Sequence, residues 1–247
     1  MTWTPMLAPA YLEHTRGPLS AVRFELVTRA ILENLPDRPC DIVDVGGGHA
    51  RQAIMLARAG HQVTVADPDP VMLAAARRNL ADEPAEVRER VRLVPGRVDG
   101  GAFDAVCCHS VLAYLDDPAP MLGHLVALAG PGGLLSVLAL NADAIAMRSG
   151  LRGDWRDGLA SLRAGRQVGD AYLPARADRV EDLAERLAGL GAPASTWYGV
   201  RIFTDHRDDS GPIDGLADLL ELEWEAGARD PYRRVARLFH LLAVKQA

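Results

Sequence analysis

A short apolar segment that leads directly into three consecutive glycines constrains the fold of this chain more than any other feature. Residues 40–50 read C-D-I-V-D-V-G-G-G-H-A, and a second apolar segment at 63–67 follows one helix length later and ends in Asp67. This order predicts a strand, a tight glycine turn, a helix and a second strand that ends in a carboxylate. Glycines let the main chain approach a ligand closely, and an acid in this position can bind a ribose. The pattern therefore predicts a nucleoside-binding α/β unit.

Strand and helix signals continue to alternate as far as residue 141. The run F-D-A-V-C-C-H at 103–109 is unbroken and apolar, as is typical of a central parallel strand. We expect strands over 41–46, 62–66, 91–94, 103–109 and 134–140, with helices over 50–59, 72–80 and 118–129. This spacing predicts an α/β fold with a doubly wound, mostly parallel sheet.

The whole chain is expected to form one domain with four parts. They are N-terminal lid helices (10–35), a cofactor-binding core (40–141), a small cap insert (142–178), and C-terminal helices and edge strands (179–247). The cap carries five glycines together with Trp155 and Tyr172, so we expect a mobile or helical insert that orders over the acceptor. Its aromatic side chains either form a core for the cap or stack on a base. Late strands over 196–203 and 238–244 predict an antiparallel pair at the sheet edge and seven strands in all.

Composition excludes several classes of protein. No apolar stretch approaches about 18–20 residues, so we expect no membrane association and a cytoplasmic location. The three cysteines are odd in number and lack metal-ligand spacing, which predicts buried thiols and no metal site. The net charge of −6 argues against a broad nucleic-acid-binding surface. Basic charge is almost all arginine, which suits planar recognition of carboxylates and phosphates.

Five short motifs occur in order between residues 40 and 141. They are D-V-G-G-G-H-A at 44–50, A-D-P at 66–68, G-R-V-D at 96–99, F-D-A-V-C-C-H-S-V-L at 103–112 and G-P-G-G at 130–133. Together they resemble the motifs of class I S-adenosylmethionine-dependent methyltransferases. The resemblance implies a Rossmann-like fold with S-adenosyl-L-methionine as cofactor. It also implies a set of cofactor-binding residues: Asp44, Gly46, Gly47, Gly48, Asp67, Pro68, Met72, Arg97, Val98, His109 and Arg23.

A narrower resemblance extends to both ends of the chain. The segments H-S-V-L-A-Y-L-D-D-P, L-N-A-D-A-I-A-M, Y-G-V-R-I-F-T-D and D-P-Y-R-R-V-A-R-L-F-H are similar to those of tRNA 5-carboxymethoxyuridine methyltransferases. Those enzymes convert the carboxylate of a modified wobble uridine to its methyl ester. The resemblance implies the tRNA anticodon loop as partner and four substrate-binding residues: Arg16, Arg201, Asn141 and Tyr114.

The acceptor stays open at this stage. The family's histidine is replaced by Thr204, and the basic run of its cap is absent, so a small carboxylate or another small-molecule (secondary-metabolite) acceptor is the alternative. A carboxylate with a pKa near ~4 is already ionised and needs no general base, and the chain shows no obvious acid–base pair. A phenol or amine acceptor would need a base, for which His109, Tyr114 and His206 are candidates.

His109 and Arg201 are the candidate catalytic residues. Arg201 interrupts the apolar run at 200–203, and a buried arginine needs an anionic partner. That partner is either a substrate carboxylate or a structural acid, Glu221 or Glu223.

Two other classes of protein share some of these sequence features. A nicotinamide-dependent oxidoreductase also uses a glycine turn and an acid, but the chain has no Tyr-x-x-x-Lys pair and no second dinucleotide-binding half. A non-enzymatic module that senses the cofactor remains the third reading. The oligomeric state, monomer or homodimer, is left open.

Overall fold

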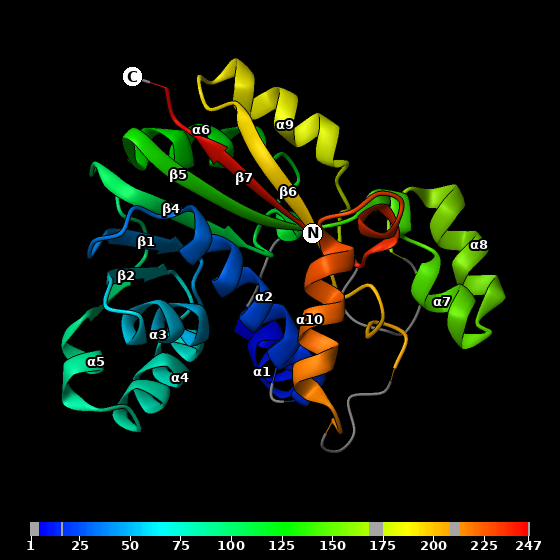
Figure 1. Ribbon diagram of the computed structural model, residues 1–247, viewed down its shortest axis with the longest axis horizontal. Coiled ribbons are helices and arrows are strands. Elements are labelled where there is room, and N and C mark those ends of the chain that lie inside the picture. Colours follow the sequence, from blue (N-terminus) through cyan, green and yellow to red (C-terminus); the bar gives the residue numbers. More distant parts are fainter. Residues whose placement is uncertain (1–4, 16, 168–174, 208–212, 247) are drawn as a thin grey trace.

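A seven-stranded sheet with helices on both of its faces makes up the molecule (Figure 1). The computed structural model describes residues 5–15, 17–167, 175–207 and 213–246. The strands are β1 (Asp41–Val45), β2 (Gln62–Asp67), β3 (Val91–Pro95), β4 (Phe103–His109), β5 (Ala129–Leu140), β6 (Ala194–Val200) and β7 (Leu238–Val244). The helices are η1 (Pro5–Leu7), α1 (Ala8–His14), α2 (Pro18–Asn34), α3 (Arg51–Arg58), α4 (Pro70–Ala81), α5 (Ala85–Glu89), η2 (Leu112–Tyr114), α6 (Ala119–Leu128), η3 (Ala142–Ala144), α7 (Met147–Arg152), α8 (Trp155–Ala164), α9 (Val180–Gly189), α10 (Leu216–Gly227) and η4 (Tyr232–Val235).

The strand order places a switch point at the centre of the sheet. The order is β3-β2-β1-β4-β5-β7-β6, with parallel pairing from β3 to β5 and antiparallel pairing of β7 with both β5 and β6. The predicted doubly wound, mostly parallel sheet with an antiparallel edge is confirmed. Because the winding direction changes between β1 and β4, the carboxyl ends of these strands flank a crevice.

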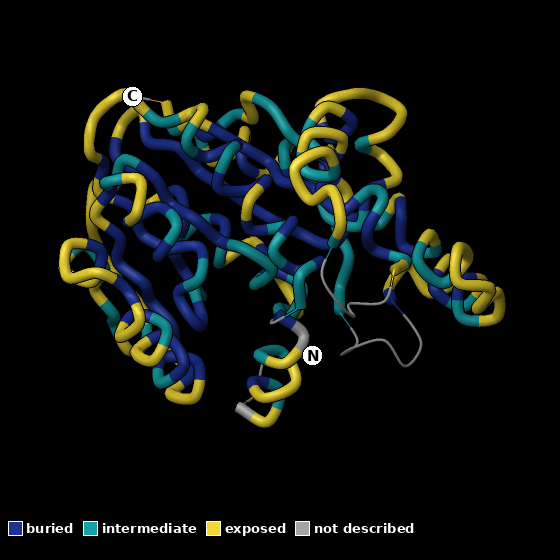
Figure 2. Tube along the Cα trace, turned by 60° about the horizontal axis from the view of Figure 1, so that its bottom comes forward, coloured by how far each residue is buried: buried dark blue, intermediate teal, exposed yellow. Residues whose placement is uncertain are grey.

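Alternating side chains of the strands build two separate cores. Ile42 and Cys107 pack against α2 and α3 on one face, whereas their neighbours Val43 and Cys108 pack against α6 and α9 on the other. Figure 2 shows buried residues concentrated along the strands and exposed residues on the outer helices. Both faces of the sheet are therefore covered, as a parallel sheet requires. None of the helices in the described part of the chain is long and apolar enough to cross a membrane.

The cap insert leaves the sheet and returns to it at one point. The Ala142 N–H donates to the Asp178 carbonyl, and the Asp178 N–H donates to the carbonyl of Leu140, the last residue of β5. Between these residues, α7 and α8 lie beyond the carboxyl end of β5 (Figure 1). The helical form of the insert agrees with the prediction, and its mobility stays a prediction. Trp155 is 77% exposed, so the expected packing of this ring in a cap core is wrong, and Tyr172 lies outside the described residues.

Several boundaries differ from the sequence prediction. The N-terminal lid helices are α1 and α2, which agrees with the prediction, whereas the short helix α5 lies in a segment for which no helix was predicted. Strand β6 ends at Val200, so Arg201 is not in the middle of a strand, and it has a left-handed φ of 64°. The reason is the buried carboxylate of Glu223 on α10, which accepts hydrogen bonds from the backbone N–H groups of Ile202 and Phe203 at 2.8 and 2.9 Å. These N–H groups bond to a side chain rather than to a neighbouring strand.

Candidate active site

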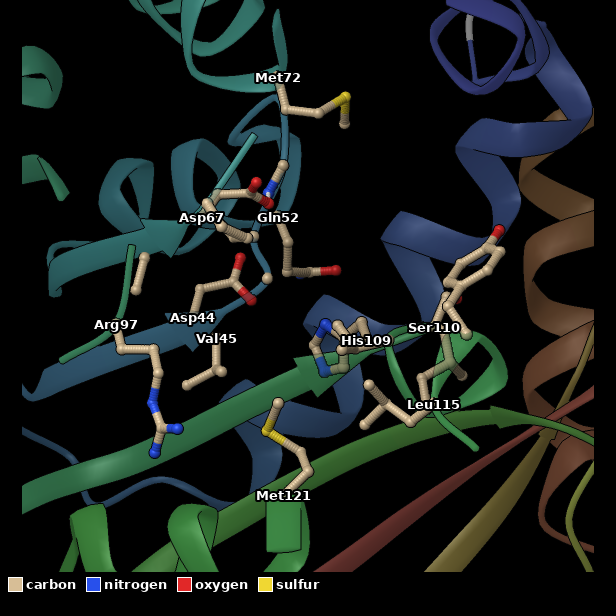
Figure 3. Close-up of a pocket in the computed structure, with 18 of the residues that line it drawn as sticks. Asp44, Val45, Gln52, Asp67, Met72, Arg97, His109, Ser110, Leu115 and Met121 are labelled. Atoms are coloured by element: carbon tan, nitrogen blue, oxygen red, sulfur yellow. Dashed lines mark hydrogen bonds between the residues drawn. The ribbon is translucent and has the colours of Figure 1, made fainter. Parts of the chain in front are cut away.

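A cavity of about 500 Å³ lies at the carboxyl ends of β1, β2 and β4 (Figure 3). Its lining comes from the glycine turn, α2, the ends of β2 and β4, and the start of α6. Most of the predicted cofactor-binding residues line it: Arg23, Asp44, Gly46, Gly47, Gly48, Asp67, Pro68, Met72, Arg97 and His109. Tyr114, predicted for the substrate, lines it too. Val98 does not line it and instead packs against the apolar core beneath.

The glycine turn has no room for side chains. A Cβ on Gly46 would lie 2.4 Å from the Val111 side chain, and one on Gly47 would lie 2.6 Å from the Asp44 carboxylate. Gly46 also has a φ of 70°, in the left-handed region that glycine adopts without strain. Ala50, two residues after Gly48, has a φ of 63°. It therefore adopts the left-handed conformation although it carries a Cβ.

Asp67 ends β2 with both carboxylate oxygens directed by backbone groups. Oδ2 accepts a hydrogen bond from the Gly48 N–H at 2.9 Å, and Oδ1 accepts one from the Asp69 N–H at 2.8 Å. The residue is only 7% exposed, and burial raises its pKa, an effect that these two bonds oppose. Each oxygen keeps a lone pair for a further donor. This arrangement fits two neighbouring hydroxyls of a ribose.

Asp44 is a buried acid that faces the cavity. It is 2% exposed, and burial together with the charge of Asp67 raises its pKa to about 7, while Arg23 opposes the shift. We find no hydrogen bond to its carboxylate within the described part of the chain. A cationic group in the cavity would stabilise the ionised form. The ammonium of the expected methionine moiety provides such a charge.

Arg23 brings a positive charge from α2 to the cavity. Its guanidinium donates to Ser110 Oγ at 3.2 Å and to the Tyr11 hydroxyl at 3.4 Å, and it lies 4.2 Å from the centroid of the Phe24 ring. An anionic group can approach the same guanidinium. Asp44 and Arg23 thus present opposite charges to one cavity, which suits a zwitterionic amino acid. The donor set and the glycine cradle together fit S-adenosylmethionine.

His109 and Tyr114 lie near Arg23 in the lining. Burial and the neighbouring His240 lower the pKa of His109 well below its usual value, so the ring is neutral. Burial raises the pKa of Tyr114 to about 12, so its phenol stays protonated. His109 Nε2 lies 2.8 Å from Ser136 Oγ. Neither residue carries a charge at neutral pH.

Other lining residues were missed by the sequence reasoning. Met121 and His124 of α6 line the cavity, as do Phe24 and Leu115. The sequence predicts a helix over residues 118–129. Periodicity shows that the helix exists but not which of its ends faces a cavity. The fixed position of this helix after β4 was the available signal.

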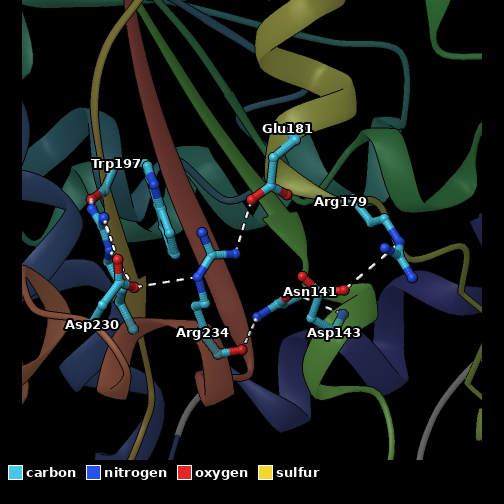
Figure 4. Close-up of polar contacts among 8 residues, drawn as sticks. Asn141, Asp143, Arg179, Glu181, Trp197, Asp230 and Arg234 are labelled. Atoms are coloured by element: carbon cyan, nitrogen blue, oxygen red, sulfur yellow. Dashed lines mark hydrogen bonds and ion pairs between the residues drawn. The ribbon is translucent and has the colours of Figure 1, made fainter.

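Two of the predicted substrate residues, Arg201 and Asn141, are described and do not line the cavity. Arg201 is buried, and its partner is Asp205 at 3.7 Å rather than the expected Glu221 or Glu223. The amide of Asn141 donates to the carbonyls of Arg234 and Ala236 at 3.0 Å each, so it anchors the segment before β7. Figure 4 shows the bond from Asn141 to Arg234.

Arg16 lies outside the described residues, so the prediction for it stays as made. No group of three or more His, Cys, Asp or Glu residues suited to a metal ion occurs among residues 5–15, 17–167, 175–207 and 213–246.

Comparison with known proteins agrees with this geometry. Residues 43–135 match the family model described as "Methyltransferase domain". The chain is 29% identical over 241 residues to the tRNA 5-carboxymethoxyuridine methyltransferase of Escherichia coli K12, covering 94% of this chain and 90% of that protein.

Solved structures show the same fold. One is a possible histamine N-methyltransferase from Thermotoga maritima, with a TM-score of 0.63, 14% identity and 98% of each chain covered. Another is the glycopeptide N-methyltransferase MtfA in complex with S-adenosyl-L-homocysteine, with a TM-score of 0.60, 15% identity and 89% of each chain covered.

Proposed function

Because this chain is a class I S-adenosylmethionine-dependent methyltransferase, we propose that it converts the carboxylate of 5-carboxymethoxyuridine in tRNA to the methyl ester. The observation that carries the proposal is the similarity to the E. coli tRNA enzyme over 94% of this chain. That similarity extends beyond residues 43–135, the part that matches the general methyltransferase domain. The C-terminal segments, which the shared cofactor core does not require, therefore also resemble a tRNA enzyme.

The part of the cavity that His109 and Tyr114 line, where we expect the acceptor, suits a nucleophile that arrives ionised. His109 and Tyr114 have pKa values displaced away from neutrality, downward and upward respectively, so neither is matched to general-base catalysis at neutral pH. A carboxylate has a free pKa near ~4 and needs no base. These properties support a carboxylate acceptor over a phenol or an amine.

The residues of this chain would bind and orient. Bound S-adenosylmethionine supplies a methyl group that is already attached to a good leaving group. Asp67 would hold the ribose hydroxyls, Asp44 would pair with the ammonium, and the glycine turn would allow close approach of the main chain. Catalysis then rests on holding the acceptor in line with the methyl group and on excluding water.

Arg201 is our further candidate for the acceptor side. It lies after β6, and Arg148 and Arg237 also contact its partner Asp205. Its Nε is buried, and no hydrogen-bond partner for it exists among the described residues. A buried N–H without a partner is costly. Arg201 does not line the cavity, so an acceptor carboxylate or phosphate would reach this atom only if this edge of the sheet opens.

The test is methyl transfer to tRNA followed by analysis of its nucleosides. Purified protein is incubated with isotopically labelled S-adenosylmethionine and tRNA that carries 5-carboxymethoxyuridine, and the digested nucleosides are analysed by mass spectrometry. We expect label in the methyl ester of this nucleoside and its release as methanol under mild alkali, because an ester hydrolyses where an ether or N-methyl group does not. Transcribed tRNA without the modification is the control. Label that resists alkali, or none in tRNA, would contradict the proposal.

A small-molecule carboxylate is the second candidate acceptor. The net charge of −6 favours it, because a tRNA-binding surface gains affinity from positive charge. Parallel methylation assays with modified tRNA and with small carboxylates separate the two candidates. A small acceptor that is methylated while modified tRNA is not would establish the second.

A further inference from the structure

Three polar side chains form a hydrogen-bonded chain behind the cavity. Ser136 Oγ lies 2.8 Å from Nε2 of His109 and 2.7 Å from Nε2 of His240. The residues belong to the adjacent strands β4, β5 and β7, and the two rings are perpendicular with centroids 5.8 Å apart. Ser136 and His240 are fully buried, whereas His109 lines the cavity. The chain therefore connects the interior of the sheet with the methyl-transfer site.

The three side chains of this hydrogen-bonded chain carry few protons that can form hydrogen bonds. Burial lowers the pKa of His240 to about 3 and that of His109 well below its usual value. Both rings are therefore neutral at neutral pH, and each carries a single N–H. The hydroxyl of Ser136 adds one more proton and two lone pairs. The directions of the two side-chain hydrogen bonds follow once one of these protons is placed. The Ser136 backbone also hydrogen-bonds to the His109 ring, a contact that raises the pKa of His109 against the effect of burial.

The proton of the His240 ring can be assigned first, from the surroundings of its Nδ1 atom. This atom is buried, and nothing in the described part of the chain hydrogen-bonds to it. Orphaned buried N–H groups are rarer than orphaned acceptors, so Nδ1 is the bare nitrogen and Nε2–H donates to Ser136 Oγ. The buried Cys107 thiol, which also contacts Ser136, has a raised pKa and stays protonated. Sulfur is a weak acceptor, so the hydroxyl proton goes to the stronger acceptor, Nε2 of His109.

We propose that Ser136 and His240 are positioning residues that hold His109 in the neutral form with its proton on Nδ1. With Nε2 occupied by Ser136, Nδ1–H is the group that His109 offers to the cavity, where it donates to an oxygen of the acceptor carboxylate. His109 is then a hydrogen-bond donor and cannot act as a general base. The site consequently selects an acceptor that arrives ionised. The identity of the acceptor rests on the proposed function, but the position of the proton does not.

Nitrogen NMR tests the proton positions directly. Long-range ¹H–¹⁵N spectra of ¹⁵N-histidine-labelled protein, recorded with S-adenosylhomocysteine and without acceptor, distinguish protonated from bare ring nitrogens. The chain has seven histidines, so the two signals are assigned from His109→Gln and His240→Gln spectra. We expect protonated Nδ1 in His109 and protonated Nε2 in His240. Protonated Nε2 in His109 would overturn the inference whatever the acceptor is.

Substitutions test whether Ser136 and His240 keep the His109 proton on Nδ1. His240→Gln keeps an N–H donor near Ser136, His240→Leu removes it, and Ser136→Ala removes the link. We expect His240→Leu and Ser136→Ala to give mixed His109 tautomers and to raise the acceptor KM about ten-fold or more, with the cofactor KM unchanged. His240→Gln should keep most of the native His109 tautomer and an acceptor KM close to the native value. Ser195→Ala is the matched control, because its hydroxyl donates to the Leu242 carbonyl on β7 and so is not part of the His109–Ser136–His240 chain.

The outcomes separate this inference from the proposed function. Identical His109 spectra in His240→Leu and His240→Gln would overturn the positioning role, and melting temperatures report whether each variant is folded. If the expected tautomers are found but modified tRNA is not methylated, the proton assignment stands and the tRNA assignment fails. In that case the acceptor KM is measured with the small carboxylate that is methylated.

Discussion

Replacing Asp67 by asparagine should weaken cofactor binding without changing the shape of the cavity. In the native protein both carboxylate oxygens are free to accept one further bond each beyond those from Gly48 and Asp69. A hydrogen bond to a charged group contributes roughly 1.5–3 kcal/mol, against roughly 0.5–1.5 for a neutral pair. The amide also replaces one acceptor by a donor. We therefore expect a loss of about 2–3 kcal/mol, or about 30- to 150-fold in Kd.

The same substitution has a separate cost in stability. One of the two backbone N–H groups would face the new amide NH₂, and an unsatisfied buried donor costs about 1–3 kcal/mol. In a chain of this size each kcal/mol lowers the melting temperature by roughly 2–4 °C. The binding measurement must therefore be made well below the melting temperature of the variant.

Isothermal calorimetry with S-adenosylhomocysteine gives the affinity, and Asp69→Asn is the matched control. Asp69 caps α4 by accepting from the Val71 N–H at 2.8 Å and does not line the cavity. Asparagine caps a helix as well as aspartate does, so this variant should bind S-adenosylhomocysteine with nearly native affinity. A folded Asp67→Asn protein with native affinity would refute the ribose assignment.

Two further predictions concern the charged groups of the fold. Because the pKa of Asp44 is raised to about 7 in the folded protein, the free protein holds a proton there that the unfolded chain, with a pKa near ~3.9, has lost. This group therefore makes the free protein less stable as pH rises from about 4 to about 7, and Asp44→Asn should remove that part of the decline. Binding of the ammonium should also release a proton near pH 6, seen by calorimetry in two buffers, and no release would argue against the pairing. Arg201→Lys should lower stability by about 1–2 kcal/mol and the melting temperature by roughly 2–8 °C, because the side chain is only 8% exposed and pairs with Asp205. The exposed Arg229→Lys is the control, and a lower kcat/KM with an unchanged melting temperature would show instead that Arg201 serves the acceptor.

The cofactor-binding residues of the glycine turn and β2 could be predicted from the sequence because the residues in contact lie close together along the chain. The glycine turn and Asp67 belong to one strand–helix–strand unit, and the bond between Gly48 and Asp67 spans 19 residues. Glycine spacing and the terminal acid are properties of such a unit by itself. The alternation of strands and helices likewise follows from local periodicity, so the sheet class was predictable from it.

The long-range contacts of the site depended on the tertiary structure. Arg23 reaches Ser110 across 87 residues, and Ser136 meets His240 across 104. Each pairing requires a strand order and a register that local patterns do not specify, because a one-residue slip turns a side chain to the opposite face. The insertion of β7 between β5 and β6 is what places His240 beside Ser136.

Arg201 shows the same limit at the scale of one residue. Its apolar neighbours predicted a strand, but the buried carboxylate of Glu223 on a later helix takes the N–H groups of residues 202 and 203. The sequence by itself determined the strand–turn–helix unit and the cofactor, since both depend on neighbours in the chain. Only the tertiary structure decided which distant side chains share protons and charge at the acceptor end, because those contacts exist only once the strands are paired.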